Sequence, residues 1–224
     1  MGNCFGTPSH GDKPSHTNFE LSNLNSINYI PESSQGEIRS KSVFYVHLVA
    51  HTVLENGGNH WDIFLQTGVS ESIRLDMTPG AFPGRYGFLG RLDITKHNYP
   101  VTTRQQKLVT IAAARRCSVG FVLDAIIQAD NHRYEFTKEG RGCTSWVRDQ
   151  FYLFVQIGLL PPGYEAQFEQ AITTAWIGGV AHGTSKVTRG TYLRDRGGNQ
   201  RQGQKKKGRM DNRNSNQARR RRAR

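Results

Sequence analysis

Apolar and polar residues alternate along much of the first half of the chain, which is the pattern of half-buried β-strands. Five runs follow it: residues 42–54, 59–65, 72–77, 85–98 and 107–114. The first is dense in β-branched and aromatic residues, which predicts a central strand buried on at least one face. The second and third flank a Gly68-centred loop, so they predict a β-hairpin. The last run favours a strand, although its apolar residues also fit a helix.

The second half of the chain changes to helical spacing. Apolar residues recur every three or four positions at residues 119–129, from Cys143 to Val155, and at residues 164–176. Ser118 is a suitable N-cap for the first of these helices. A short alternating segment with Tyr134 and Phe136, followed by a Gly-rich turn, precedes Cys143. The patterns together predict an α+β fold, in which a short antiparallel sheet packs against two or three helices.

Composition divides the chain into three parts. Residues 1–38 are rich in Ser, Asn, Pro, Gly and His without periodicity, which predicts a disordered leader. Residues 39–183 hold the periodic segments and predict a single α+β domain. Residues 184–224 are almost entirely polar or basic, so we expect a disordered tail that cannot form a core.

The positive charge is concentrated in this tail. From Lys186 to the end there are 15 Lys and Arg against 2 Asp, so this segment has a net charge of +13. The whole chain has a net charge of +12, so the first 185 residues carry −1. The densest basic runs are Lys205, Lys206, Lys207 and Arg219, Arg220, Arg221, Arg222. Such runs bind nucleic acid by releasing counterions, bind anionic lipid headgroups, or act as nuclear import signals. Simply solvated charge is the alternative.

The first residues resemble a lipidation signal. Gly2 follows a removable Met, as N-myristoylation requires, and Cys4 would suit palmitoylation. The stricter motif has a hydroxyl where this chain has Gly6, so an unmodified terminus is the alternative. One acyl chain holds a protein only marginally on a membrane, so Cys4 or the basic tail would be the second anchor.

Several classes of protein are disfavoured by composition. There is no apolar run of 18 residues to span a membrane and no secretory signal. The three cysteines, Cys4, Cys117 and Cys143, are odd in number and widely spaced, which argues against a disulfide scaffold and for a reducing compartment. We therefore expect an intracellular protein, at the cytoplasmic face of a membrane or in the nucleus. His and Cys do not cluster at ligand spacing, so no metal or cofactor is expected.

Cys143 is the candidate reactive residue. It falls at the first turn of a predicted helix, where unpaired N–H groups and the helix dipole favour a thiolate. The glycines before it allow backbone and substrate to approach closely. A small buried residue at a helix start is the alternative interpretation. Trp61 and Trp146 are expected to anchor the hairpin on this helix.

The segment Asn59-His60-Trp61-Asp62-Ile63-Phe64-Leu65, closed by Ser72-Ile73-Arg74-Leu75, resembles a motif of the circularly permuted papain-like superfamily. Its members include lecithin–retinol acyltransferase-like enzymes, NlpC-type peptidases and permuted deubiquitinase-like proteases. Residues 134–146 look like the second half of that motif. Residues 40–183 are also similar to an uncharacterised fungal domain family with an Asn-His-Trp strand and a Gly-Cys-x-x-Trp helix start. The first resemblance implies a permuted papain-like fold. The second brings no known activity with it.

The resemblance implies that Cys143 is a nucleophile and that His60 is the base that deprotonates it. The acyltransferase-like relatives have a third His where this chain has Arg74, so Asp76 or Asp62 would have to orient His60 instead. Several relatives also have Asn where Gly142 stands. Arg74 is either a solvated or paired residue of the sheet, or a fixed positive charge that lowers the pKa of Cys143.

Three functions are consistent with these observations. The first is a cysteine hydrolase or acyltransferase that works through a thioester, with lipid favoured as the acyl source because both termini would hold it at a membrane. The second is a non-catalytic scaffold of the same fold, suggested by the missing third His. The third is nucleic-acid binding through the basic tail.

Overall fold

The computed structural model describes residues 26–55 and 58–194. The chain begins with β1 (Ile27–Ile30), the short 3-10 helix η2 (Glu32–Ser34) and α1 (Gln35–Ser40). Five long strands follow: β2 (Ser42–Val53), β3 (Asn59–Gly68), β4 (Glu71–Pro83), β5 (Gly87–His97) and β6 (Lys107–Ser118). Next come α2 (Val119–Gln128), β7 (Tyr134–Thr137), α3 (Cys143–Gln156) and α4 (Glu165–Ile172). The last elements are β8 (Thr174–Ile177), β9 (Val180–Thr184) and β10 (Thr191–Tyr192).

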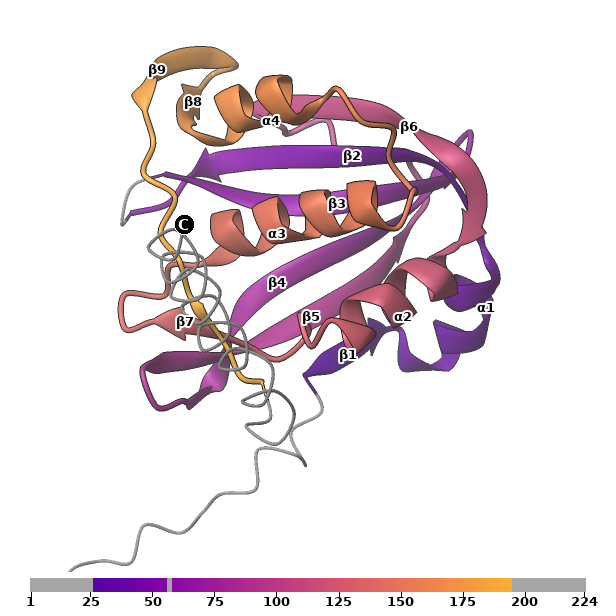
Figure 1. Cartoon of the computed structure of the whole chain (residues 1–224), viewed down its shortest axis with the longest axis horizontal. Coiled ribbons are helices and arrows are strands. Elements are labelled where there is room, and N and C mark those ends of the chain that lie inside the picture. The colour runs from indigo at the N-terminus through magenta and orange to yellow at the C-terminus, as the bar shows by residue number, and fades with distance from the viewer. Residues whose placement is uncertain (1–25, 56–57, 195–224) are drawn as a thin grey trace, which may run out of the picture.

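A large curled sheet dominates the molecule (Figure 1). Its strands lie in the order β10-β7-β5-β4-β3-β2-β6 and pair antiparallel, and β1 adds a parallel pairing to β5. Of the described residues, 46% lie in strands and 25% in helices. The predicted short antiparallel sheet packed on two or three helices, and with it the permuted papain-like fold class, is therefore wrong.

The error comes from long-range strand pairing. Within β5, residues 87–89 pair with β7 and residues 92–95 pair with β1, so short distant segments extend the sheet along one edge. β1 and β10, of four and two residues, carry too little periodicity to be recognised in a sequence. β4 and β6 also run several residues beyond the predicted strands, to Pro83 and Ser118.

One face of the sheet carries α2, α3 and α4 (Figure 1). The core between them is aromatic: the Phe151 and Phe168 rings stack at 4.3 Å, and Trp61 meets Phe168 edge-on at 6.4 Å. Trp61 and Trp146 are both buried, which confirms that they are core residues. This packing holds α3 across β3 and so fixes where the first residue of α3 lies.

Most individual elements agree with the sequence patterns. The strand at residues 42–54, the β3–β4 hairpin and the strand beginning at residue 107 are confirmed. Ser118 Oγ accepts a hydrogen bond from the Phe121 amide at 3.1 Å, which confirms it as the N-cap of α2. The helix predicted at residues 164–176 is wrong only in its last four residues, because α4 ends at Ile172 and β8 begins at Thr174. A turn at Gly178 and Gly179, both with positive φ, connects β8 to β9, and the two strands pair antiparallel.

The folded part extends beyond both predicted domain boundaries. Before residue 39, β1 pairs with β5 and Ile38 is fully buried. After residue 184, β10 pairs with β7, and the Tyr192 hydroxyl lies 2.8 Å from Asp149 Oδ2. The predicted lipidation sites and basic runs lie outside the described residues: Gly2, Cys4, Lys205, Lys206, Lys207, Arg219, Arg220, Arg221 and Arg222. Among the described residues no helix has the length and apolarity needed to cross a membrane.

Candidate active site

Cys143 is the first residue of α3, and its thiol is almost buried, with 6% of the residue exposed. The preceding Gly142 has φ 154° and lies against Tyr134, so a Cβ there would come within 2.9 Å of the Tyr134 ring. The Tyr134 hydroxyl donates to the Gly142 carbonyl at 3.0 Å. Glycine before the cysteine is therefore required by packing.

His60 lies near the start of β3, beside the N-terminus of α3. Cys143 and His60 line one cavity, and each shifts the pKa of the other toward its charged form. Thr144 Oγ1 lies 3.9 Å from the sulfur. Burial raises the pKa of Cys143, but His60 and the Trp61 N–H outweigh burial and leave that pKa below its ordinary value.

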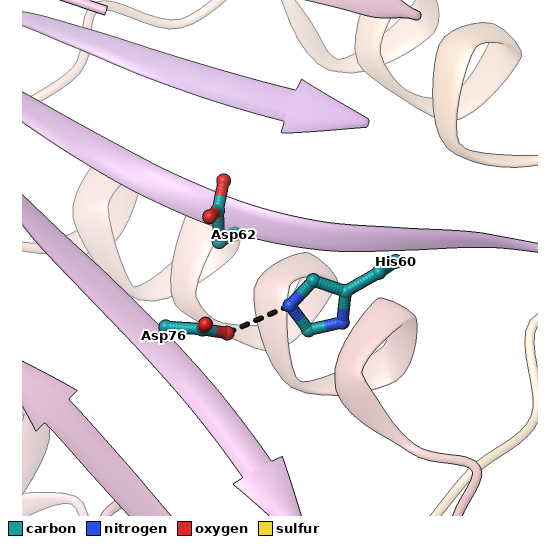
Figure 2. Close-up of side chains that lie close together, drawn as sticks. All are labelled: His60, Asp62 and Asp76. Atoms are coloured by element: carbon teal, nitrogen blue, oxygen red, sulfur yellow. Dashed lines mark hydrogen bonds and ion pairs between the residues drawn. The ribbon is translucent and has the colours of Figure 1, made fainter. Parts of the chain in front are cut away.

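Asp76 binds the other side of His60. Pairing of Ile63 with Leu75, continued along the hairpin, sets Asp62 opposite Asp76 and makes His60 a diagonal neighbour of Asp76. His60 Nε2 and Asp76 Oδ1 are 2.7 Å apart, and the dashed line in Figure 2 marks this contact. Burial lowers the pKa of His60, but Asp76 and Cys143 together raise it well above its ordinary value. Burial alone would raise the pKa of Asp76, yet His60 and Arg74 keep it low.

Arg74 holds two carboxylates together. Its Nη2 lies 2.6 Å from Asp76 Oδ2, and its Nε bonds to Asp62 Oδ2. The fully buried Asp62 also contacts His51 Nε2, at 2.8 Å. Arg74 is thus a paired residue. The contacts form a continuous network from His60 through Asp76 and Arg74 to Asp62, and Cys143 lines the same cavity as His60.

The network also brings together possible metal ligands. His60, Asp62 and Asp76 each offer a ligand atom, and these atoms lie within 4.8 Å of one another (Figure 2). Arg74 already bonds to both carboxylates, and His60 Nε2 bonds to Asp76. A cation here would have to displace the guanidinium or meet its charge at close range, so the arrangement suits proton transfer better than metal binding.

Two hollows meet at Cys143. The larger, with a cavity volume of about 650 Å³, includes His60 and the apolar side chains Leu54, Pro79 and Phe136 in its lining; we call it the cleft. The smaller, of about 20 Å³, lies between the turn at residues 140–142 and the segment at residues 185–188; we call it the pocket. A substrate bound across both hollows would have its central bond beside the thiol.

The sequence analysis assigned Cys143, His60, Asp76 and Arg74 to one candidate site. In the structure these four residues lie close together. Sequence reasoning missed the Trp61 N–H, because a backbone donor leaves no trace in residue identity. It also missed Asn59, whose buried amide donates to the His51 and Trp176 carbonyls at 2.7 and 2.8 Å and fastens β8 to the start of β3. The signal that could have pointed to Asn59 was its position directly before His60, in the Asn-His-Trp strand.

Comparison with known proteins leaves the activity open. A family model described as a domain of unknown function (DUF7770) matches residues 46–193, a span that contains both His60 and Cys143. No curated protein and no solved structure matches the chain.

Proposed function

Since the chain belongs to the family of the domain of unknown function DUF7770, its chemistry has to be argued from the site, and we propose that it is a cysteine-dependent hydrolase or acyltransferase. Cys143 is the nucleophile, His60 is the general base and acid, and Asp76 orients His60. The observation that carries the proposal is that Cys143 and His60 line the same cleft, with Asp76 Oδ1 2.7 Å from His60 Nε2.

The electrostatics support this assignment of roles. The pKa of Cys143 is lowered and that of His60 is raised, so each stabilises the charged form of the other. The pair therefore favours the thiolate and the imidazolium over the two neutral forms. A structural cysteine in an apolar site would have its pKa raised by burial, as Cys117 does.

The reaction follows from these charges. The Cys143 thiolate attacks the acyl carbon, and a C–S bond forms while the carbonyl π electrons move to oxygen. The backbone N–H groups at the start of α3 are the donors available to that oxyanion. The tetrahedral intermediate collapses, the bond to the leaving group breaks with its electron pair, and His60 gives that group its proton. Water or another acceptor then attacks the thioester, loses a proton to His60, and releases Cys143 as thiolate.

The motif resemblance to permuted papain-like enzymes supports the same roles, because a His-bearing strand precedes the Cys-bearing helix in both. It extends to the motif alone, since the large curled sheet differs from the fold that was expected. A membrane location through Gly2 and Cys4, with a lipid as acyl source, stays a prediction, as does nucleic-acid binding by the tail.

The deciding experiment is the pH dependence of iodoacetamide labelling at Cys143, followed by mass spectrometry of the labelled peptide. We expect the labelling midpoint to lie below about 8.5, the value of a free thiol, and to rise in His60→Ala. Cys117 is the internal reference, since burial raises the pKa of its thiol and it should label only at higher pH. His182→Ala, at an exposed residue of β9, controls for loss of an imidazole elsewhere.

A midpoint near that of a free thiol, and unchanged in His60→Ala, would contradict the proposal. The non-catalytic scaffold would then be the better interpretation. A low midpoint that depends on His60 would justify searching for substrates by trapping the thioester at Cys143.

A further inference from the structure

The two hollows that meet at Cys143 carry opposite charges. The charged side chains that line the pocket are both basic, Arg141 and Lys186. Those that line the cleft, apart from His60, are both acidic, Glu55 and Glu139. The sulfur therefore lies on the boundary between a basic and an acidic region.

The geometry fixes which half of a substrate faces each region. His60 lines the cleft and is not among the residues that line the pocket. Because His60 has to protonate the leaving group, that group lies in the cleft, against Leu54, Pro79 and Phe136. The half that stays bound to sulfur then faces the pocket. With about 20 Å³, the pocket has room for a group no larger than a carboxylate close to the reacting carbon.

The pocket is also a built feature, because hydrogen bonds hold both of its walls. The Tyr134 hydroxyl donates to the Gly142 carbonyl and accepts from the Gly190 amide at 2.8 Å, which joins the glycine turn to the C-terminal segment. The Ser185 amide donates to the Thr173 carbonyl at 2.7 Å. Arg141 and Lys186, one on each wall, are thus held on opposite sides of the same small space.

We propose that Arg141 and Lys186 bind a carboxylate on the acyl half of the substrate, while the leaving half, apolar and neutral or cationic, occupies the cleft beside His60. This inference rests on the proposed function and specifies its substrate class, a short acyl group that bears a negative charge. Hydroxyl groups of Thr144, Ser185 and Thr188 line the same pocket and are available as donors to the anion.

Two alkylating reagents that differ only in charge test the inference. Iodoacetate and iodoacetamide both transfer a two-carbon group to sulfur and release iodide. The carboxylate of iodoacetate therefore represents a negative charge on the half of the substrate that stays bound to sulfur. The ratio of their rate constants at Cys143 does not depend on the fraction of thiolate, since both reagents attack the same ion. The ratio therefore reports the charge around the pocket separately from the reactivity of the thiol.

The full-length chain is compared with Arg141→Gln, Lys186→Gln and Lys138→Gln. Lys138 is an exposed residue of the same turn that lines neither hollow, so its variant makes the same change in net charge away from the pocket. We expect the iodoacetate-to-iodoacetamide ratio to fall about fivefold in each pocket variant, the effect of one unit charge at about 4 Å in water. The ratio should be unchanged in Lys138→Gln.

A ratio that stays constant in both pocket variants, or falls equally in Lys138→Gln, would overturn the inference. If Cys143 still labelled with a low, His60-dependent midpoint, the proposed function would survive that result. If labelling by both reagents had the midpoint of a free thiol, the proposed function would fail, and the inference with it.

Discussion

His60 Nε2 and Asp76 Oδ1 lie 2.7 Å apart on neighbouring strands of one hairpin. This contact occupies one ring nitrogen of His60 and leaves Nδ1 for the Cys143 thiol. It does for His60 what the third residue of a catalytic triad does, because it fixes the ring orientation and stabilises the imidazolium. Arg74 in turn holds the Asp76 carboxylate, with its Nη2 2.6 Å from Oδ2.

Asp76→Asn tests this role. We expect the rate of acyl transfer at Cys143 to fall about 100-fold, a typical loss for a general acid–base group that is wrongly oriented or protonated. The labelling midpoint of the thiol should rise at the same time, because His60 loses the carboxylate that raises its pKa. Both effects are measured by labelling across a pH series and by burst kinetics with an activated ester.

The matched control is Asp93→Asn, since Asp93 lies directly across from Asp76 in the register of β4 and β5 but pairs with Arg91 at 2.8 Å. A midpoint that moves as far in Asp93→Asn as in Asp76→Asn would mean that general charge, and not the His60 contact, sets the reactivity of Cys143.

The activity should show a bell-shaped dependence on pH. On the acid side the thiolate is lost as pH falls through the Cys143 pKa, which is lowered, so this limb lies below the pKa of a free thiol. On the alkaline side the imidazolium is lost as pH rises through the His60 pKa, which is well above its ordinary value. The two limbs belong to the coupled pair, so we expect a broad plateau around neutrality. A profile whose alkaline limb begins below about 6.5, the ordinary pKa of His, would contradict the assignment of roles.

The sequence carried enough information to find the reacting groups but not the sheet that holds them. His60 and Asp76 could be assigned to one hairpin because the turn and the alternation are local signals. Cys143 could be assigned to a helix start because Gly142 and the apolar spacing after it are local too. Each of these predictions depended on residues no more than 16 positions apart.

The extra edge of the sheet depends on contacts between distant segments. β1 pairs with β5 through Ile27 and Leu92, and β10 pairs with β7 through Tyr192 and Tyr134. Neither β1 nor β10 has an apolar run long enough to indicate a strand, because both are stabilised by their partners. The same holds for Asn59, whose partner Trp176 lies 117 positions away. Such contacts have no signature in composition or period.

Arg74→Gln should destabilise the fold. Asp62 is fully buried and shares its Oδ2 between Arg74 and His51, so removal of the guanidinium leaves a buried charge without its strongest partner. We expect a loss of about 3 kcal/mol or more in the free energy of unfolding, measured by urea denaturation. The double variant Asp62→Asn with Arg74→Gln should recover part of that loss, because the buried charge is removed as well.

Arg91→Gln provides the comparison for an exposed ion pair. Arg91 bonds to Asp93 with half of its side chain exposed, so its loss should cost about 1 kcal/mol or less. Equal losses in Arg74→Gln and Arg91→Gln would mean that Arg74 is an ordinary surface residue.

Tyr134→Phe should weaken the attachment of the C-terminal segment to the glycine turn beside the pocket. The aromatic ring is kept, so the variant should leave no cavity in the core. The Tyr134 side chain is 1% exposed, and its hydroxyl joins the Gly142 carbonyl to the Gly190 amide. Removal of the hydroxyl leaves the Gly190 amide without its acceptor, while the Gly142 carbonyl keeps the Trp146 amide as a donor. The loss should cost about 1 to 3 kcal/mol. We expect hydrogen exchange at the Gly190 amide to become faster, because that amide loses its acceptor. Exchange in the centre of α3 should change much less.

Tyr152→Phe is the control for loss of a tyrosine hydroxyl. Tyr152 lies on the outer side of α3, is 39% exposed, and bonds to Glu169 at 2.7 Å, so water can replace its partner. We expect no change in exchange at Gly190 in this variant. If the Gly190 amide exchanged at the wild-type rate in Tyr134→Phe as well, the C-terminal segment would be held by the β10–β7 pairing alone. The Tyr134 hydroxyl would then have no part in forming the pocket beside Cys143.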